Sequence, residues 1–322
     1  MQNFPKYYNE QLKAAINKFN GLKKDDCFAF ITDVHCHDCS LTAVPLLKAF
    51  AKETALKKLF CGGDFAYAFG TKDDCLSDTQ KCLDYIAKAK PELEVFNVRG
   101  NHDITIRTSW EEKSGYTHPK DLTNALILSK NSPVTNAMNN EACYYIDDEL
   151  KKIRYVVINT GDSQSENSSA FWGVNYSAGE KQLEWLAENA FNFENDEGWT
   201  VIAFGHIPCS PKISDYAPEL KGLNDLLAAF KNKRKHEFAD FSNSKAEFAA
   251  YICGHNHKDD SATDDGVLHI SSGSEACYND DVFKRTLGTI TETLADVFAI
   301  NKSERTIFAV RLGAGNDRVF KY

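Results

Sequence analysis

Five short segments of the sequence end apolar runs with side chains that can bind a metal ion or move a proton. They are Asp33-Val34-His35, Gly63-Asp64, Gly100-Asn101-His102-Asp103, Gly205-His206 and Gly254-His255-Asn256-His257. Each apolar run is typical of a buried strand. In an open α/β sheet the carboxyl ends of the strands line one crevice where ligands bind. We therefore expect the segments to converge on one site.

The donors in these segments are carboxylate, amide oxygen and imidazole, without thiolate. This mixture favours divalent zinc, manganese or iron, and there are enough ligands for two metal ions that share a carboxylate. Two cations about 3.5–4 Å apart can hold a hydroxide as nucleophile and clamp a phosphoryl oxygen at the same time. The chemistry indicated is the hydrolysis of a phosphate ester by a metal-bound hydroxide.

Alternating strands and helices must position the first three segments. Apolar strands are predicted over residues 27–33, 58–61 and 93–98. Helices, in which apolar side chains recur at helical spacing, are predicted over residues 6–20, 43–54 and 78–88. This alternation predicts an α/β fold with a parallel sheet and helices on its faces.

The other two polar segments follow strands predicted over residues 200–204 and 248–253. Two longer stretches, about 105–150 and 209–245, are expected to run over the active-site face. Periodicity is weak over residues 105–140 of the first, and residues 144–146 are expected to begin a hairpin that returns to the sheet. The second stretch contains a predicted helix whose apolar side chains recur at helical spacing.

The C-terminal part of the chain, residues 266–322, contains strands that follow one another without helices. They are predicted over residues 267–271, 294–300 and 306–312. Strands joined by short turns pair antiparallel, so we expect these strands in a second sheet. Because the sequence shows no repeat or linker, residues 1–322 are expected to form one domain.

Composition and charge narrow the class of protein. With 43% hydrophobic and 26% charged residues, the 322-residue chain lies in the range of ordinary globular proteins. Its net charge of −9 argues against a nucleic-acid groove. No apolar run is long enough to predict a membrane span, and the N-terminal residues lack the apolar core of a signal peptide. Ten scattered cysteines fit reduced thiols, so we expect a cytoplasmic protein with a small-molecule phosphoester substrate.

Taken together and in this order, the five segments resemble the calcineurin-like metallophosphoesterase family over roughly residues 28–273. The resemblance implies two facing mixed β-sheets flanked by helices, a four-layer α/β sandwich. The tail, residues 311–318, is also similar to the closing segment of a group of bacterial family members.

The resemblance also implies the ligands of two divalent metal ions. One ion would be held by Asp33, His35, Asp64 and His257. The other would be held by Asp64 as the bridging carboxylate, together with Asn101, His206 and His255.

Three further residues receive roles from the same resemblance. His102 would stay off the metals and stabilise the phosphoryl group or protonate the leaving group, and Asp103 would fix its tautomer and raise its basicity. Arg99 resembles the arginine of the phosphoprotein phosphatase branch, where it would contact the substrate phosphate; it is equally a candidate for a salt-bridged surface residue. Because Phe65 and Ala66 follow Asp64 in place of Arg-Gly, a Ser/Thr protein phosphatase is disfavoured.

The substrate is left open by the sequence. A phosphodiester is slightly preferred over a phosphomonoester, since bacterial relatives are often diesterases. Aromatic residues outside the predicted strands, such as Trp110, Phe171 and Tyr176, could form a platform for a base or a lipid-like group, or could pack the loops.

Two other classes of protein compete with this prediction. Asp33-Val34-His35-Cys36-His37 also resembles the first strand of amidohydrolase barrels and of polymerase-and-histidinol-type phosphoesterases, which would need His37 as a ligand. A non-catalytic metal-binding scaffold of the same fold is the second alternative, and the complete ligand set argues against it. Cys36-His37-Asp38-Cys39 is half of a zinc knuckle, but the sequence contains no second Cys-x-x-Cys to complete it.

Overall fold

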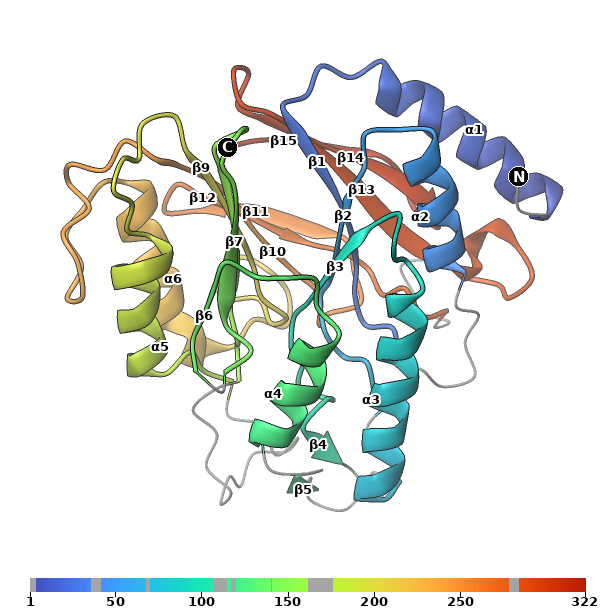
Figure 1. Ribbon diagram of the computed structural model, residues 1–322, viewed down its shortest axis with the longest axis horizontal. Helices are drawn as coiled ribbons and strands as arrows, with labels where there is room; N and C mark the ends of the chain where they lie inside the picture. Colours follow the sequence, from blue (N-terminus) through green and yellow to red (C-terminus); the bar gives the residue numbers. More distant parts are fainter. Residues whose placement is uncertain are drawn as a thin grey trace.

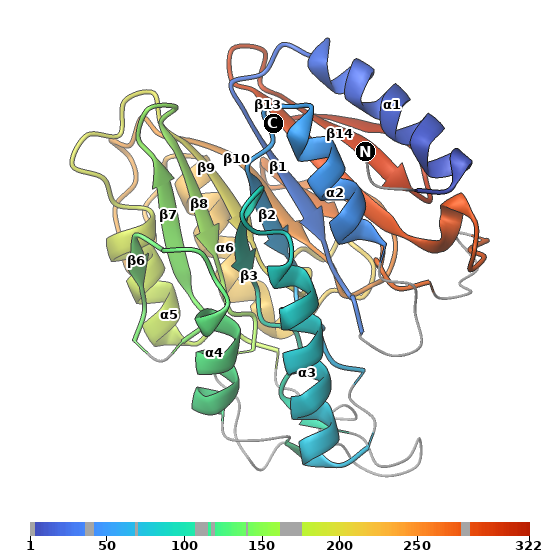
Figure 2. The same cartoon turned by 45° about the vertical axis from the view of Figure 1, so that its right-hand side comes forward.

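The computed structural model describes residues 4–35, 42–67, 70–106, 115–116, 120–139, 141–161, 176–277 and 284–322. Two mixed β-sheets face each other, and helices cover the outer face of each (Figure 1, Figure 2). The predicted four-layer α/β architecture is confirmed. In Figure 1, α1, α2 and α3 lie outside one sheet at the right, and α5 and α6 lie outside the other at the left.

The first sheet has six strands in the order β15-β14-β13-β1-β2-β3. Its parallel strands are β1 (Asp26–Ile31), β2 (Lys58–Cys61) and β3 (Glu94–Asn97). The antiparallel strands are β13 (Leu294–Asn301), β14 (Thr306–Gly313) and β15 (Arg318–Lys321). The covering helices are α1 (Lys6–Asn20), α2 (Ala43–Lys52) and α3 (Lys72–Ala87).

The second sheet has seven strands in the order β11-β12-β10-β9-β8-β7-β6. They are β6 (Asn136–Ala137), β7 (Tyr144–Asp148), β8 (Ile153–Val157), β9 (Thr200–Phe204), β10 (Glu247–Cys253), β11 (Asp260–Asp264) and β12 (Val267–Ser271). Strands β8, β9, β10 and β12 are parallel. The outer face is covered by α5 (Glu180–Trp185), the π-helical turn η1 (Leu186–Ala190) and α6 (Lys221–Lys231), which the 3-10 turn η2 (Pro218–Leu220) precedes.

Three smaller elements complete the described structure. Helix α4 (Lys120–Ser129) and the two-stranded sheet of β4 (Thr105–Ile106) and β5 (Gly115–Tyr116) lie below the sheets in both views (Figure 1, Figure 2). The 3-10 turn η3 (Ile290–Glu292) precedes β13. No helix in the described part of the chain is long and apolar enough to cross a membrane.

The apolar runs of the central strands reflect burial on both faces. Every residue of β1 is buried: Phe28 and Phe30 face the other sheet, and Ala29 and Ile31 face the helices. Such strands lack polar alternation because neither face meets water. The two sheets share one aromatic core, and we therefore retain the expectation of a single domain.

That shared core is built from rings of opposite sheets. Phe60 of β2 stacks on Phe204 of β9 with ring centroids 4.0 Å apart. Phe28 makes edge contacts with Phe204 and Tyr155. Aromatic pairs of this kind each contribute about 0.5–1.5 kcal/mol beyond their area burial, so the stacking fixes how the sheets lie against each other.

The structure corrects the predicted position of the C-terminal strands. Strands β13, β14 and β15 pair antiparallel, as expected, but β13 pairs with β1 and completes the first sheet. Strand β12 lies parallel to β10 in the second sheet. The physical reason is that β1 needs a hydrogen-bonding partner on the edge that β2 leaves free, which local periodicity cannot reveal.

Helix α3 begins earlier than predicted, at Lys72 instead of residue 78. Thr71 and Asp74 form a capping box, in which each side chain accepts from the other's backbone N–H. Helix α6 agrees with its prediction, and its buried face includes Leu223, Leu227 and Phe230.

A charged network joins the two sheets at the end where β1 begins. The buried Asp26 accepts hydrogen bonds from Lys58 Nζ at 3.1 Å, from Lys151 Nζ at 2.7 Å and from the Tyr155 hydroxyl. Lys58 also lies 3.2 Å from Asp148. Asp26 and Lys58 belong to the first sheet, and the other three residues belong to the β7–β8 hairpin of the second.

Replacing Asp26 by Asn should lower the free energy of unfolding by roughly 3 kcal/mol. That is the low end for breaking a buried pair, and it applies because Lys58 is buried while Lys151 is partly exposed. Urea denaturation with an unchanged m-value measures the effect. Glu10→Gln in the exposed Lys6–Glu10 pair is the control and should leave the midpoint almost unchanged. An Asp26→Asn midpoint equal to that of the wild type would contradict the prediction.

Candidate metal centre

The predicted ligands converge at the end of the structure where the parallel strands terminate. Asp33 and His35 follow β1, Asp64 follows β2 and Asn101 follows β3, all in the first sheet. The second sheet contributes three histidines, which follow β9 and β10: His206, His255 and His257. The site therefore lies across the interface between the sheets.

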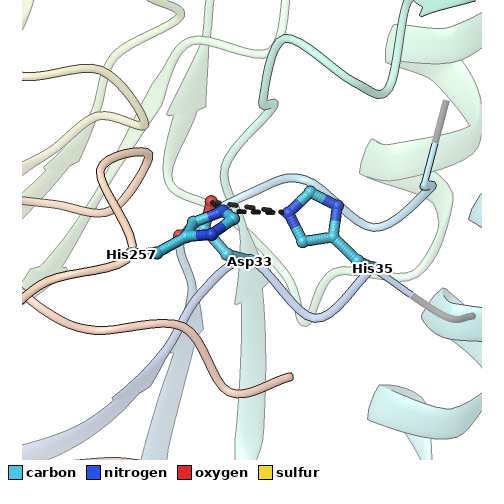
Figure 3. Close-up of side chains that lie close together, drawn as sticks. All are labelled: Asp33, His35 and His257. Atoms are coloured by element: carbon cyan, nitrogen blue, oxygen red, sulfur yellow. Dashed lines mark hydrogen bonds and ion pairs between the residues drawn. The ribbon is translucent and has the colours of Figure 1, made fainter. Parts of the chain in front are cut away.

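One group of potential ligands consists of Asp33, His35 and His257, whose ligand atoms all lie within 4.8 Å of one another. Asp33 Oδ1 lies 3.3 Å from His257 Nε2 and 3.8 Å from His35 Nε2. The two imidazole nitrogens are 3.2 Å apart. Figure 3 shows the ring nitrogens of both histidines turned towards the carboxylate of Asp33.

A second group consists of Asp64, His206 and His255, again within 4.8 Å. His206 Nε2 lies 3.1 Å from Asp64 Oδ2. Asn101 Oδ1 lies 3.0 Å from both His206 Nε2 and His255 Nδ1. Asn101 thus joins this group, as the sequence predicts.

Asp64 lies between the two groups. Its Oδ2 is 3.1 Å from His206 Nε2 of the second group and 3.9 Å from His35 Nε2 of the first. Its Oδ1 accepts a hydrogen bond from the backbone N–H of His102 at 2.8 Å, which leaves Oδ2 to face both groups. The arrangement has the form that a carboxylate shared by two cations requires.

The donor set fits a cation because its lone pairs point at one another. His206 Nδ1 donates to the carbonyl of Gly62 at 2.7 Å, and His35 Nδ1 donates to the carbonyl of Ala66 at 2.9 Å. Their Nε2 lone pairs then face carboxylate oxygens, an arrangement that is repulsive unless a proton or a cation lies between them. Asp33 Oδ1, at the centre of the first group, is buried and has no hydrogen bond of acceptable geometry within the described ranges.

The pKa values of the histidines in the cluster are shifted in opposite directions. Burial, followed by the neighbouring His102, lowers the pKa of His35 to about 4, and burial with His206 lowers the pKa of His255 to about 3. Burial opposes the charge of His206 too, but Asp64 and Asp33 outweigh it and raise the pKa of His206 to about 9. Neutral imidazoles are the form that ligates metal ions, and a raised pKa marks the position where positive charge is most stabilised.

The backbone at the site is held in an unusual conformation. Positive φ angles occur at Asp33 (52°), His35 (39°), Asp64 (56°), His255 (72°) and His257 (57°). Such angles cost of the order of 1–3 kcal/mol each for residues other than glycine and gather at functional sites. The loops also approach each other closely at the site, since a Cβ added to Gly254 would overlap Asp33 Oδ2.

His102 lies beside Asp64 at the partly exposed edge of the cluster. Its Nδ1 donates to the carbonyl of Tyr67 at 3.0 Å, and its Nε2 is 3.8 Å from Asp64 Oδ2. Geometry also allows a third ligand group of His35, Asp64 and His102. The expectation that His102 stays off the metals therefore remains a prediction.

The role expected for Asp103 is corrected by its contacts. Its carboxylate accepts backbone N–H hydrogen bonds from Gly100 and Phe65, both at 2.7 Å, and longer ones from Asp64 and Ala66. The described partner of His102 Nδ1 is the Tyr67 carbonyl, so Asp103 does not fix its tautomer. Asp103 instead joins the loop after β2 to the loop after β3.

Arg99 is 2% exposed, so the prediction of a salt-bridged surface residue is wrong. Its guanidinium donates to Asn124 Oδ1 at 2.9 Å and to the carbonyl of Gly161. These contacts hold α4 and the segment after β8 against the end of β3. The expected contact of Arg99 with the substrate phosphate stays a prediction.

The sequence carried no signal for the carbonyls of Gly62, Ala66 and Tyr67, which set the histidine tautomers, because any residue supplies a carbonyl. Tyr176, a predicted aromatic candidate, has its ring 5.5 Å from that of His255. His37, Trp110 and Phe171 lie outside the described residues, as does the half zinc knuckle.

Solved structures with a similar fold have low sequence identity. GAP50, the anchor in the inner membrane complex of Plasmodium, is 14% identical with a TM-score of 0.52; the match covers 92% of this chain and 89% of that one. This likeness shows the fold alone.

Two further matches have lower TM-scores. A candidate 5′-nucleotidase from Staphylococcus aureus is 12% identical (TM-score 0.47); the match covers 92% of this chain but 54% of that one, so this chain spans about half its length. The phosphopantetheinyl hydrolase from Mycobacterium tuberculosis is 15% identical (TM-score 0.42), with 77% and 89% covered.

The comparison with curated proteins found no match. The family model described as calcineurin-like phosphoesterase matches residues 28–259, which contain all of the predicted ligands. This agrees with the resemblance carried by the five polar segments. The chain belongs to the calcineurin-like phosphoesterase family.

Proposed function

We propose that this chain is a hydrolase that cleaves phosphate esters with two divalent cations, and that it prefers phosphodiesters. The observation that carries the proposal is that two carboxylate oxygens, Asp33 Oδ1 and Asp64 Oδ2, each face imidazole Nε2 atoms at 3.1–3.9 Å. Family membership supports metal-dependent phosphoester hydrolysis in general. The use of two ions and the diester preference are our inference.

The residues present fit two cations. Asp33, His35 and His257 with Asp64 would hold one, and Asp64 with Asn101, His206 and His255 would hold the other. Zinc, manganese and iron suit such mixed oxygen and imidazole ligands. When bound, they would polarise the phosphoryl oxygens and lower the pKa of a water molecule.

His102 would handle the proton of the reaction. Because its Nδ1–H is held by the Tyr67 carbonyl, Nε2 is the atom available to a substrate. Its side chain is 20% exposed, against 0% for His206 and 1% for His35. In its protonated form, Nε2–H could be given to the leaving oxygen or could stabilise the phosphoryl group.

The charge of the site favours a phosphodiester. Two divalent cations held by two carboxylates leave two positive charges for the substrate and the attacking hydroxide. A diester carries one negative charge and balances this while His102 is neutral, whereas a dianionic monoester would need the positive charge of protonated His102 as well. Within the described ranges, no lysine or arginine pairs with Asp33 or Asp64.

We also propose a small-molecule substrate and a cytoplasmic location. The net charge of −9 supports a substrate other than nucleic acid. The described cysteines are free thiols, which supports a reducing compartment.

Replacing Asp64 by Asn should remove both metal ions and the activity together, because Oδ2 serves both ligand groups. Metal content after dialysis against manganese, measured by mass spectrometry, and hydrolysis of a bis-aryl phosphate check this. Asp84→Asn, in a surface pair with Lys130, is the control. An active Asp64→Asn protein with two bound ions would rule out the shared carboxylate.

Replacing His102 by Ala should leave the metal content unchanged and lower kcat by about 10²–10⁴-fold, the range for loss of a general acid or base. The matched control is His236→Ala, because the His236 ring lies in the loop before Phe238. Loss of metal with the His102 side chain would instead make it a ligand, as the third group with His35 and Asp64 allows.

Chelation should abolish hydrolysis, and re-addition of manganese should restore it on a bis-aryl phosphate more than on an aryl monophosphate. The ratio of kcat/KM for the two substrates measures the preference. A higher value for the monoester would overturn the diester proposal. No hydrolysis of either ester by protein loaded with manganese, zinc or iron would favour the metal-binding scaffold.

A further inference from the structure

A second charged network lies between the sheets, at the end where the metal centre is found. It consists of Arg311 of β14, Asp296 of β13, Arg318 of β15 and Asp259, the residue before β11. Asp296 and Arg311 are directly opposite each other in the β13–β14 ladder. They continue the rows of Phe298 and Ala309, which belong to the core between the sheets.

Arg311 crosses from the first sheet to the second. Its Nη2 lies 2.9 and 2.7 Å from the two carboxylate oxygens of Asp259, and its Nε donates to Asp296 at 2.9 Å. Arg318 supports the same bridge, since it bonds to Asp296 and to the carbonyl of Ser271. Two arginines and two aspartates balance in charge.

The charged groups of this bridge are buried, which makes their pairing necessary. Arg311 is 3% exposed and Asp296 is fully buried, so each charge needs a partner inside the protein. Asp259 belongs to the second sheet's metal-binding loop, where its Oδ1 accepts from the backbone N–H of Gly273 at 3.1 Å and lies 3.5 Å from Arg318 Nη2. Within the described residues, the bridge thus ends on that loop.

The loop that Arg311 reaches carries two of the predicted ligands. It begins at Gly254, whose N–H donates to the carbonyl of His206 at 3.0 Å, and continues with His255, whose N–H donates to Asp33 Oδ2 at 3.0 Å. The far end of the loop, two residues beyond His257, is held by the contact of Asp259 with Arg311. Since Asp33 comes from one sheet and His257 from the other, their separation depends on how the loop is fastened.

We infer that Arg311 is a positioning residue of the metal centre, which acts through Asp259 to hold His257 beside Asp33 and His35. This inference rests on the proposed metal site. It assigns a part in metal binding to the C-terminal strands, which lie beyond residues 28–259, the part matched by the family model.

Manganese binding measured by isothermal titration tests the inference without reference to activity. The wild-type protein should bind two ions. In Arg311→Gln and in Asp259→Asn, the affinity of one ion should fall about 10–100-fold, the usual effect of removing a residue that orients a ligand, while the affinity of the other is retained.

Two further variants separate positioning from the removal of a charge. The double variant should bind manganese no more weakly than Asp259→Asn alone, because Arg311 acts through Asp259, and Asp259→Asn also removes the pairing with Arg318. Arg311→Lys should recover part of the affinity, since lysine restores the charge but not the planar fork of donors.

Asp26→Asn is the matched control, because it breaks a comparable buried network at the opposite end of the same core. It should lower the melting temperature and leave both manganese affinities unchanged. If Arg311→Gln fails to fold, Asp259→Asn carries the test, since Asp259 is 16% exposed.

Two results would overturn the inference alone: wild-type affinities for both ions in Asp259→Asn, or equal weakening of both ions in Asp259→Asn and in Asp26→Asn. Absence of manganese binding by the wild-type protein would overturn the proposed metal site and this inference with it. The stoichiometry of the wild type therefore distinguishes the two failures.

Discussion

The packing of one sheet against the other is the constraint on which the candidate site depends. Each group of ligands takes side chains from both sheets: His257 meets Asp33 and His35, and His206 meets Asp64. A change in the relative position of the sheets would alter these separations directly. The aromatic core, with Phe60 stacked on Phe204 at 4.0 Å, supplies the stiffness, because close-packed interiors resist displacement.

Charged networks close both ends of this aromatic core. Asp26, Lys58 and Lys151 join the sheets where β1 begins, and Asp259, Asp296 and Arg311 join them near the metal centre. Buried ion pairs add little net stability, but they penalise any arrangement that separates the partners. The first network stabilises the fold far from the ligands, and only the second contacts a loop that carries predicted ligands.

The ligand cluster itself opposes folding, because it buries carboxylates and holds the backbone of five residues at positive φ. Backbone groups offset part of this cost. The loops after β1 and β2 are joined by hydrogen bonds from Asp33 N to Gly63 O and from His35 N to Asp64 O. Asp103 adds four N–H contacts, which gives it a structural part in the site instead of the catalytic one expected. A bound cation would relieve the remaining repulsion between lone pairs.

The sequence alone predicted which side chains gather at the candidate site, since glycine and ligand-capable side chains directly follow the apolar strands, and the strand ends of an α/β sheet meet at one edge. Apolar runs and helical spacing also predicted the strands and helices, because they are local properties, whereas the two facing sheets were implied by the family resemblance. Only the tertiary structure decided that β13 pairs with β1, that Asp103 bonds to backbone instead of to His102, and that Arg311 reaches Asp259. These depend on contacts between residues far apart in the chain, about which local periodicity carries no information.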